Sequence, residues 1–189
     1  MNIVYPIKDF DLISRIKNEL SQYTNNIEKR RYILFVCGLY TGLRISDILK
    51  LKVGDITESD VLRIREQKTQ KQNVFPINED LKRIIKKEYK GVDLNELLFP
   101  TRYKRLCKEK TITRKTAYND INIILKAYGI NYNVGCHTLR KTFGYSFYKK
   151  SGDISMLMMW YNHDSIETTK RYIGIDIDER AKAIKNFKF

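Results

Sequence analysis

The stretch HTLRKTF at residues 137–143 sets the framework for the rest of this sequence. Its pattern predicts a helix in which His137 and Arg140, one turn apart, lie on the same face. An imidazole beside a guanidinium suits an anionic ligand. The chain's other histidine, His163, follows in YNHDS at 161–165, and Tyr172 follows in TTKRYIG at 168–174. The sequence therefore predicts an anion site with a hydroxyl nearby that can act as a nucleophile.

Each of these residues also has a purely structural interpretation. A single histidine on a helix commonly packs or caps, and any one of the thirteen tyrosines fits an ordinary core aromatic. Both histidines of the chain nevertheless fall in this one window, which favours a functional site. Cys136, beside His137, is a weak candidate for thiol catalysis because adjacent residues on a helix point in different directions.

Composition narrows the class of protein. The 189 residues fit one domain, and a formal net charge of +14 with a pI near 9.6 points to a polyanionic partner. Nucleic acid is the first candidate, because Lys and Arg release counterions from phosphates, and a membrane surface is the second. No apolar run approaches the roughly 20 residues that span a bilayer, and the opening MNIVYP does not resemble a secretory signal. We therefore expect a soluble, cytoplasmic protein.

The three cysteines do not form a recognisable framework. Cys37, Cys107 and Cys136 are odd in number, widely spaced and not in CxxC pairs. This spacing argues against both a disulfide scaffold and a zinc site.

Apolar spacing predicts a mainly helical chain. Residues 7–20 have helical periodicity, and a second helix runs from about residue 27 to Thr41, with a nearly all-apolar run at 33–37 that should cross the centre of the domain. Gly42 suits the closing turn of that helix. The next stretch should pack Ile45, Ile48 and Leu49 inward and leave Arg44 and Asp47 on the opposite side. Further helices are expected at 78–90, from 113 to 128, from 138 to about 150, from 153, and near the C-terminus after a lead-in at 175–178.

The middle of the chain predicts a β-hairpin. Residues 61–66 alternate between polar and apolar types, a turn is expected at 69–73, and a second strand should follow at 74–77, with Lys68 near the tip. A lysine there is either solvated surface or a group that reaches into a DNA groove. Residues 97–100 fit either a third short strand or an extended link. Arg114 and Lys115, among hydroxyls at a helix start, suit phosphate contacts.

Taken together, these segments resemble the successive boxes of the tyrosine recombinases, or phage integrases. The matching segments are TGLRISD at 41–47, QKT at 67–69 ahead of VFP at 74–76, HTLRKTF at 137–143, Asn162-His163, and TTKRY at 168–172. The resemblance runs from about residue 7 to the C-terminus. It implies a single catalytic domain of the α+β class, mainly α-helical with a small antiparallel sheet.

The resemblance also implies roles for six residues, all matched in order. Arg44 and Arg140 would clamp the scissile phosphate, and Tyr172 would attack phosphorus with His137 as its base. Lys68 would protonate the leaving 5′ oxygen, and His163 would hold a non-bridging oxygen or steady the tyrosine. A 3′-phosphotyrosyl link would conserve the bond energy, so neither metal nor nucleotide cofactor is expected. Further DNA contacts are expected from Lys71, Arg114, Lys115, Lys141 and Arg171.

Two departures from the family pattern affect these expectations. Asn162 stands where the family usually has glycine, which alters a turn but no catalytic group. The separate N-terminal core-binding domain of the family is not matched, so we expect residues 1–189 to be the catalytic domain alone. Three interpretations follow: an excised domain, a minimal recombinase, or a remnant that binds DNA poorly.

The resemblance implies double-stranded DNA as the partner and a homotetramer on DNA, with the tail at 175–189 docking on a neighbouring subunit. Two other functions remain open from the sequence. One is relaxation of supercoils by chemistry like that of a type IB topoisomerase, and the other is a noncatalytic DNA-binding module of the same fold.

Overall fold

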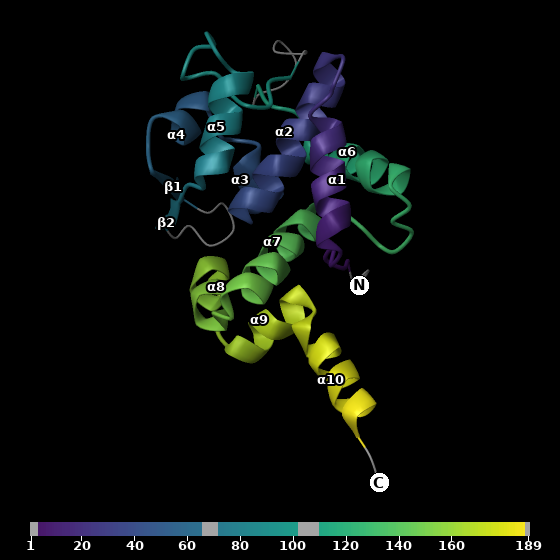
Figure 1. Cartoon of the computed structure of the whole chain (residues 1–189). Helices are drawn as coiled ribbons and strands as arrows, with labels where there is room; N and C mark the ends of the chain where they lie inside the picture. Colours follow the sequence, from purple (N-terminus) through teal and green to yellow (C-terminus); the bar gives the residue numbers. More distant parts are fainter. Residues whose placement is uncertain (1–3, 66–71, 102–109, 188–189) are drawn as a thin grey trace.

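The computed structural model describes residues 4–65, 72–101 and 110–187. Within these ranges it contains ten helices and one two-stranded antiparallel sheet, which confirms the expected mainly helical α+β class (Figure 1). The elements are α1 (Phe10–Leu20), α2 (Asn26–Thr41), α3 (Ile45–Ile48), α4 (Val53–Thr57), β1 (Val61–Arg65), β2 (Gln72–Pro76), α5 (Glu79–Glu88), α6 (Arg114–Ala127), α7 (Cys136–Ser151), α8 (Ile154–Tyr161), α9 (Ile166–Ile173) and α10 (Ile175–Asn186).

Helix α2 is the central element of the larger core, as its apolar run predicts. Residues 32–38 of α2 are all buried, so this helix is covered by neighbours on every side. Its Gly38 allows close packing against α7, since a Cβ atom there would lie 2.6 Å from Cδ1 of Leu139. The helix ends at Gly42, whose φ of 59° is the left-handed conformation that glycine adopts readily.

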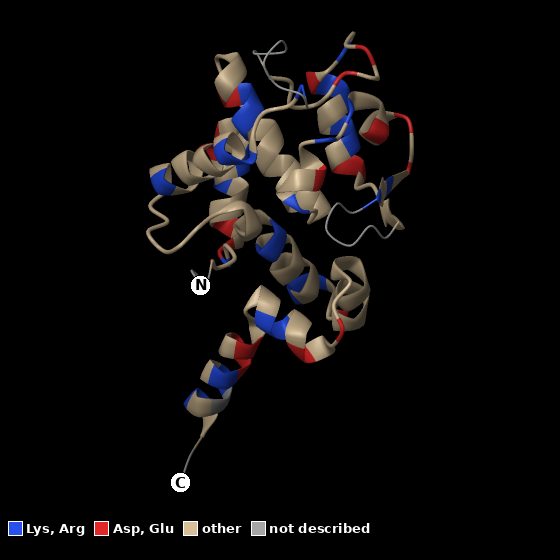
Figure 2. Cartoon of the chain, turned by 180° about the vertical axis from the view of Figure 1, so that it is seen from behind, with Lys and Arg blue, Asp and Glu red and all other residues tan. Residues whose placement is uncertain are grey.

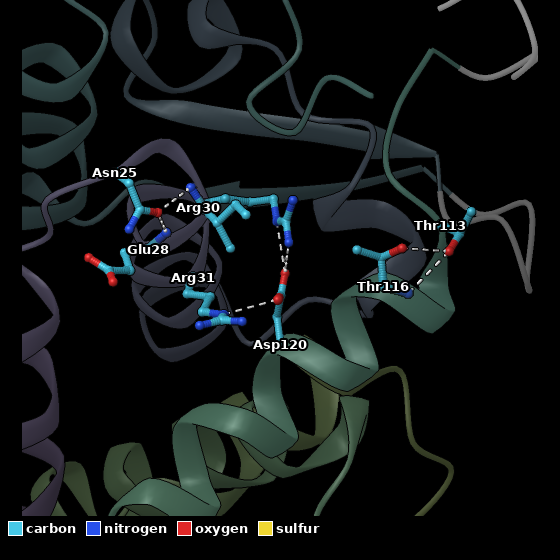
Figure 3. A network of polar contacts seen from close by, with 8 residues as sticks. Asn25, Glu28, Arg30, Arg31, Thr113, Thr116 and Asp120 are labelled. Carbon is cyan, nitrogen blue, oxygen red and sulfur yellow. Dashed lines mark hydrogen bonds and ion pairs between the residues drawn. The ribbon is translucent and has the colours of Figure 1, made fainter. Parts of the chain in front are cut away.

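A buried carboxylate joins α2 to α6. Asp120 of α6 accepts hydrogen bonds from Nε of Arg30 at 2.8 Å and from Nε of Arg31 at 3.1 Å, both on α2 (Figure 3). Thr113 caps the start of α6 by accepting from the amide of Thr116. Asp120 is almost fully buried, and the two guanidinium groups offset the cost of removing its charge from water.

The hairpin forms with a longer second strand than the sequence predicts. Gln72 and Asn73 pair with Arg65 and Ile64, so they belong to β2 and not to the expected turn. Cross-strand pairing outweighs the turn preference of asparagine at this position. The buried side chains Leu62 and Phe75 face each other in the register, and they attach the sheet to the larger core.

Of the two alternatives for residues 97–100, the structure has the extended link: isolated bridges join Lys52 to Leu97 and Pro100 to Thr111, and no third strand occurs in the described part of the chain. Two other expectations are corrected. Asp47 is only 5% exposed and so does not lie on a solvent face, because α3 is a single turn packed on both sides. Helix α7 begins at Cys136, two residues before the expected start.

A second, smaller core holds the C-terminal helices together. It consists of Tyr145, Leu157, Tyr161, Ile173 and Ile175. Among the apolar residues Ile154, Leu157, Met158 and Trp160 of α8, only Leu157 is fully buried, and the other three are half-buried. Helix α10 begins directly at Ile175, without the expected lead-in, and points away from the body (Figure 1). Its acidic residues lie in the first half of the helix and its basic residues in the second half (Figure 2).

Within the described ranges, none of the helices combines the length and the apolar character needed to cross a membrane.

Candidate active site

Helix α9 holds Tyr172 in a fixed orientation. Ser165 caps the start of the helix through the amide of Thr168, and Gly174, with a φ of 77°, closes its end. The inward face of α9 packs Thr169 and Ile173 at full burial. Tyr172 lies on the half-buried flank next to them. The nucleophile expected from the sequence is therefore carried on a short, capped and well-packed helix.

The hydroxyl of Tyr172 contacts His137 of α7. Nδ1 of His137 lies 3.1 Å from the phenolic oxygen, a hydrogen-bonding distance, across 35 residues of sequence. Burial raises the pKa of Tyr172, and the positive charges of Arg140 and Arg44 partly offset this effect. Partial burial, reinforced by the charges of Arg140 and Lys141, lowers the pKa of His137. A neutral imidazole is therefore favoured beside a protonated phenol.

Arg140 lies beneath this pair in a buried position. It is 3% exposed, and its Nη1 donates a hydrogen bond of 2.6 Å to the carbonyl of Gly42. Its guanidinium carbon lies 4.3 Å from the centre of the Tyr161 ring, in a cation–π arrangement. Tyr161 in turn donates a hydrogen bond of 2.6 Å to the carbonyl of Arg140. The backbone of one helix and the ring of another thus fix the guanidinium.

Arg44 reaches the same site from the turn that follows α2. It is the residue before α3, two positions after Gly42, with an extended backbone. Its positive charge opposes the rise in the pKa of Tyr172 and adds to the lowering of the pKa values of His137 and His163, which places it near all three. Because Arg140 binds the Gly42 carbonyl, the two arginines expected to act together are joined through one short turn.

His163 follows the end of α8 and lies against Tyr172. Its ring centre is 5.1 Å from that of Tyr172, and its Nδ1 is 3.1 Å from Oγ1 of Thr169. Asn162 closes α8 with a φ of 53°, a left-handed conformation that asparagine tolerates better than most residues. Asparagine therefore provides the turn for which the family usually has glycine, and His163 reaches the site.

The expected DNA-contacting residues take different positions. Arg114 and Lys115 are exposed at the start of α6, and Arg171 is exposed on α9. Lys141 instead places its ammonium 5.0 Å above the ring of Tyr172, and burial lowers its pKa. Lys68 and Lys71 lie outside the described residues.

Sequence reasoning missed three supporting side chains. Tyr161 supports Arg140, and Thr169 contacts His163. Trp160 donates from its ring nitrogen to the carbonyl of Thr41 at 3.0 Å and packs against Phe75 of the hairpin at 5.0 Å between ring centres. The available signal was their position in the sequence, since all three lie within three residues of His163 or Tyr172.

The site thus combines one phenol, two imidazoles and two guanidinium groups. Such a cluster favours an anion that carries several oxygens, as a phosphodiester does. The phenol next to a neutral imidazole also provides an oxygen nucleophile with a base in contact.

Comparisons with known proteins agree with this arrangement. The model of the phage integrase family matches residues 9–178. The chain is 42% identical over 187 residues to the "Probable integrase/recombinase YoeC" of Bacillus subtilis (strain 168), covering 99% of this chain and 98% of that protein. It spans about half the length of the next two curated relatives, 55% and 45%.

Solved structures show the same fold. The XerH recombinase in its post-cleavage complex with a palindromic difH substrate superposes with a TM-score of 0.69 at 20% identity, covering 96% of this chain and 53% of that one. The catalytic domain of bacteriophage HP1 integrase gives 0.62 at 20% identity, covering 97% and 95%. Neither topoisomerase-like relaxation nor a noncatalytic module is favoured by these relatives. The chain belongs to the phage integrase family, the tyrosine-type site-specific DNA recombinases, and its fold is that of their catalytic domain.

Proposed function

We propose that this chain cleaves and rejoins DNA strands through a 3′-phosphotyrosyl link formed by Tyr172. The observation that carries the proposal is the contact of 3.1 Å between the Tyr172 hydroxyl and Nδ1 of His137, beside Arg140 and His163. A phenol with a raised pKa is a poor nucleophile at neutral pH, so a base in contact with it is what strand cleavage needs.

In the proposed step, the phenolic oxygen of Tyr172 forms a bond to phosphorus while the bond from phosphorus to the 5′ oxygen breaks. His137 accepts the phenolic proton, and Lys68 gives a proton to the departing 5′ oxygen. A 5′ hydroxyl from a second strand then attacks the phosphotyrosyl link and restores both the tyrosine and a phosphodiester. The link conserves the energy of the broken bond, so rejoining needs no nucleotide.

Arg44 and Arg140 serve the transition state in this proposal. The pentacoordinate phosphorus carries more negative charge on its oxygens than the starting diester does. The guanidinium of Arg140, fixed before DNA arrives, stabilises that charge without reorganising during the reaction, and Arg44 adds a second positive charge. The bond from Arg140 to Gly42, together with the Tyr161 ring beneath it, provides this fixed geometry.

We further propose that the protein acts on double-stranded DNA in the cytoplasm, as a tetramer assembled through its tail. XerH in its complex with difH is a DNA-bound relative in fold, and Arg114, Lys115 and Arg171 are exposed cations on this chain. Helix α10 exposes Ile177 by 52% and Ile184 by 75%, and both suit a contact with a neighbouring subunit. Deletion of 177–189, which leaves the buried Ile175 in place, should lower strand exchange more than the stability of the remaining fold, and unchanged exchange would refute the role of the tail.

Covalent trapping tests the proposed chemistry. The protein is mixed, without metal or nucleotide, with nicked duplex suicide substrates drawn from DNA beside its own gene, and the products are separated on a denaturing gel. A shifted band that is absent with Tyr172→Phe supports the proposal, whereas a band that persists in this variant refutes it. Relaxation of a plasmid without any recombination site would favour the topoisomerase function instead.

Two controls separate catalysis from binding. Arg140→Ala should abolish the adduct while DNA binding is retained, and a change confined to affinity would favour a noncatalytic module. If DNA is bound and no adduct forms, the same assay is repeated with a core-binding domain fused before Met1. This fusion tests whether the catalytic domain needs a clamp on the opposite side of the duplex.

A further inference from the structure

Thr169 links the helix that carries the nucleophile to His163. It lies one turn before Tyr172 on α9, and its side chain is fully buried. Its Oγ1 is 3.0 Å from the carbonyl oxygen of Ser165 on one side and 3.1 Å from Nδ1 of His163 on the other. One buried hydroxyl therefore makes two hydrogen bonds.

The direction of these two bonds follows from counting protons. A carbonyl oxygen can only accept, so the single hydroxyl proton of Thr169 is used in the bond to Ser165. The oxygen of Thr169 must then accept from His163, which requires a proton on Nδ1. A neutral imidazole has only one N–H, so Nε2 of the neutral ring carries a lone pair and cannot donate.

We propose that Thr169 is a positioning residue that holds the ring proton of His163 on Nδ1, so that Nε2 can donate to a DNA phosphate only when the ring is a cation. The donation from Nε2 to a DNA phosphate rests on the proposed strand cleavage. Thr169 touches neither DNA nor the reacting atoms in this scheme. It acts through His163, because the hydrogen-bond partner of one ring nitrogen determines whether the other nitrogen carries a proton or a lone pair.

The groups around His163 determine how readily its ring becomes the cation that this donation requires. Arg140 of α7 and Arg44 before α3 face it with positive charge, Asp164 lies beside it, and the rings of Tyr161 and Tyr172 pack against it. Lys141 and His137 of α7 contact Tyr172. Burial and then the two arginines lower the pKa of His163, and Asp164 opposes them. A DNA phosphate brings negative charge, so binding of DNA should be coupled to uptake of a proton by His163.

The first experiment reads the ring proton directly. The chain has only two histidines, so the imidazole nitrogen NMR spectrum of the 15N-labelled 189-residue protein contains two rings, and a His137→Gln variant leaves only that of His163. Above the pKa of His163, we expect a protonated Nδ1 and a bare Nε2. Thr169→Ser keeps the hydroxyl and should keep this pattern. Thr169→Val has the same shape without the hydroxyl and should move the proton to Nε2. A wild-type ring with its proton on Nε2 would overturn the proposal, whether or not the variants fold.

The second experiment measures the consequence for cleavage. Single-turnover adduct formation on the nicked suicide substrate is followed against pH for Thr169→Ser and Thr169→Val. The Ser variant should lose rate at high pH as the His163 cation disappears, whereas the Val variant keeps a neutral donor at Nε2. The ratio of the Val rate to the Ser rate should therefore rise with pH, by up to about tenfold per pH unit above the pKa of His163. A purely structural role of Thr169 would lower the rate of the Val variant equally at every pH. A ratio of the two rates that does not change with pH would therefore overturn the proposed donation from Nε2 to phosphate.

The two experiments separate this inference from the proposed function. An absence of adduct with every variant at every pH, alongside a protonated Nδ1, would refute the proposed cleavage and with it the donation to phosphate. The assignment of the ring proton by Thr169 would still hold, because the NMR measurement needs no DNA.

Discussion

Replacing Gly144 of α7 with alanine should destabilise the protein, although the same change inside a helix normally stabilises it. Alanine has the better helix propensity, by about 1 kcal/mol. A Cβ atom at residue 144 would, however, lie 2.7 Å from Cγ2 of Ile173 and 2.9 Å from Cε2 of Tyr161, and closer still to the Tyr161 hydroxyl. Both neighbours are fully buried, so neither can move into solvent.

The magnitude follows from these opposing effects. Forcing an extra carbon into a packed core costs about 1–3 kcal/mol, and packing on two sides places Gly144→Ala in the upper part of that range. After subtraction of the gain in propensity, the free energy of unfolding should fall by about 1–2 kcal/mol. For a chain of this length that corresponds to a Tm lower by about 2–8 °C. Circular dichroism measures the transition, and the fluorescence of Trp160, the chain's single tryptophan, reports the local packing.

Activity should fall further than stability. Tyr161 supports both the carbonyl and the guanidinium of Arg140, so displacing its ring should slow adduct formation at temperatures where Gly144→Ala remains folded. Adding Tyr161→Phe removes the nearest obstructing atom and should recover part of the lost stability, with a coupling of about 0.5–1 kcal/mol. A Tm that rises in Gly144→Ala would refute the reasoning.

Three further predictions concern charged groups. The lowered pKa of His137 should place the acid limb of the cleavage profile at lower pH than an ordinary histidine would, because the proposed base becomes neutral at lower pH; His137→Gln should remove that limb in a single-turnover series. Lys141→Met should slow cleavage by about two- to fivefold, because it removes about 0.5–1 kcal/mol of cation–π stabilisation of the Tyr172 ring. Lys141→Arg retains the charge and is the control, and equal cleavage rates for the two variants would count against this role. Asp120→Ala should lower the free energy of unfolding by about 1–3 kcal/mol in thermal melts. This is less than the loss for a fully buried pair, because both arginines remain about a quarter exposed. Asp80→Ala, which removes an exposed ion pair, provides the comparison.

Much of this fold could be predicted from local patterns in the sequence. The periodicity of α1, α2 and α5 and the alternation of β1 reflect burial on one or more faces, which local sequence encodes directly. The errors fell where tertiary contacts outweigh local preference. Asn73 pairs in a strand despite its turn preference, and Asp47 is buried in a helix too short to have a separate polar face.

The candidate site was predictable only in part. The box residues could be named because their types and order resemble a family, and the contact between His137 and Tyr172 agrees with that expectation. The support provided by Tyr161 and Thr169 does not follow from the spacing of residues along one helix, because it depends on how α8 packs on α7 and on how α9 packs against the turn after α8. The position of Lys141 over a tyrosine ring, too, is a property of packing between helices.

The turn at Gly42 has a consequence for how DNA binding is coupled to folding. The carbonyl of Gly42 restrains Arg140, so the rotational freedom of this side chain is reduced when the chain folds, and two residues later the same backbone places Arg44. A phosphate that enters the site then meets a guanidinium whose conformational entropy has already been lost, and less of the binding free energy is spent on ordering it. The same restraint holds like charges close together before any anion is present. An inorganic oxyanion such as sulfate should therefore raise the thermal stability of the DNA-free protein, by binding the folded state alone.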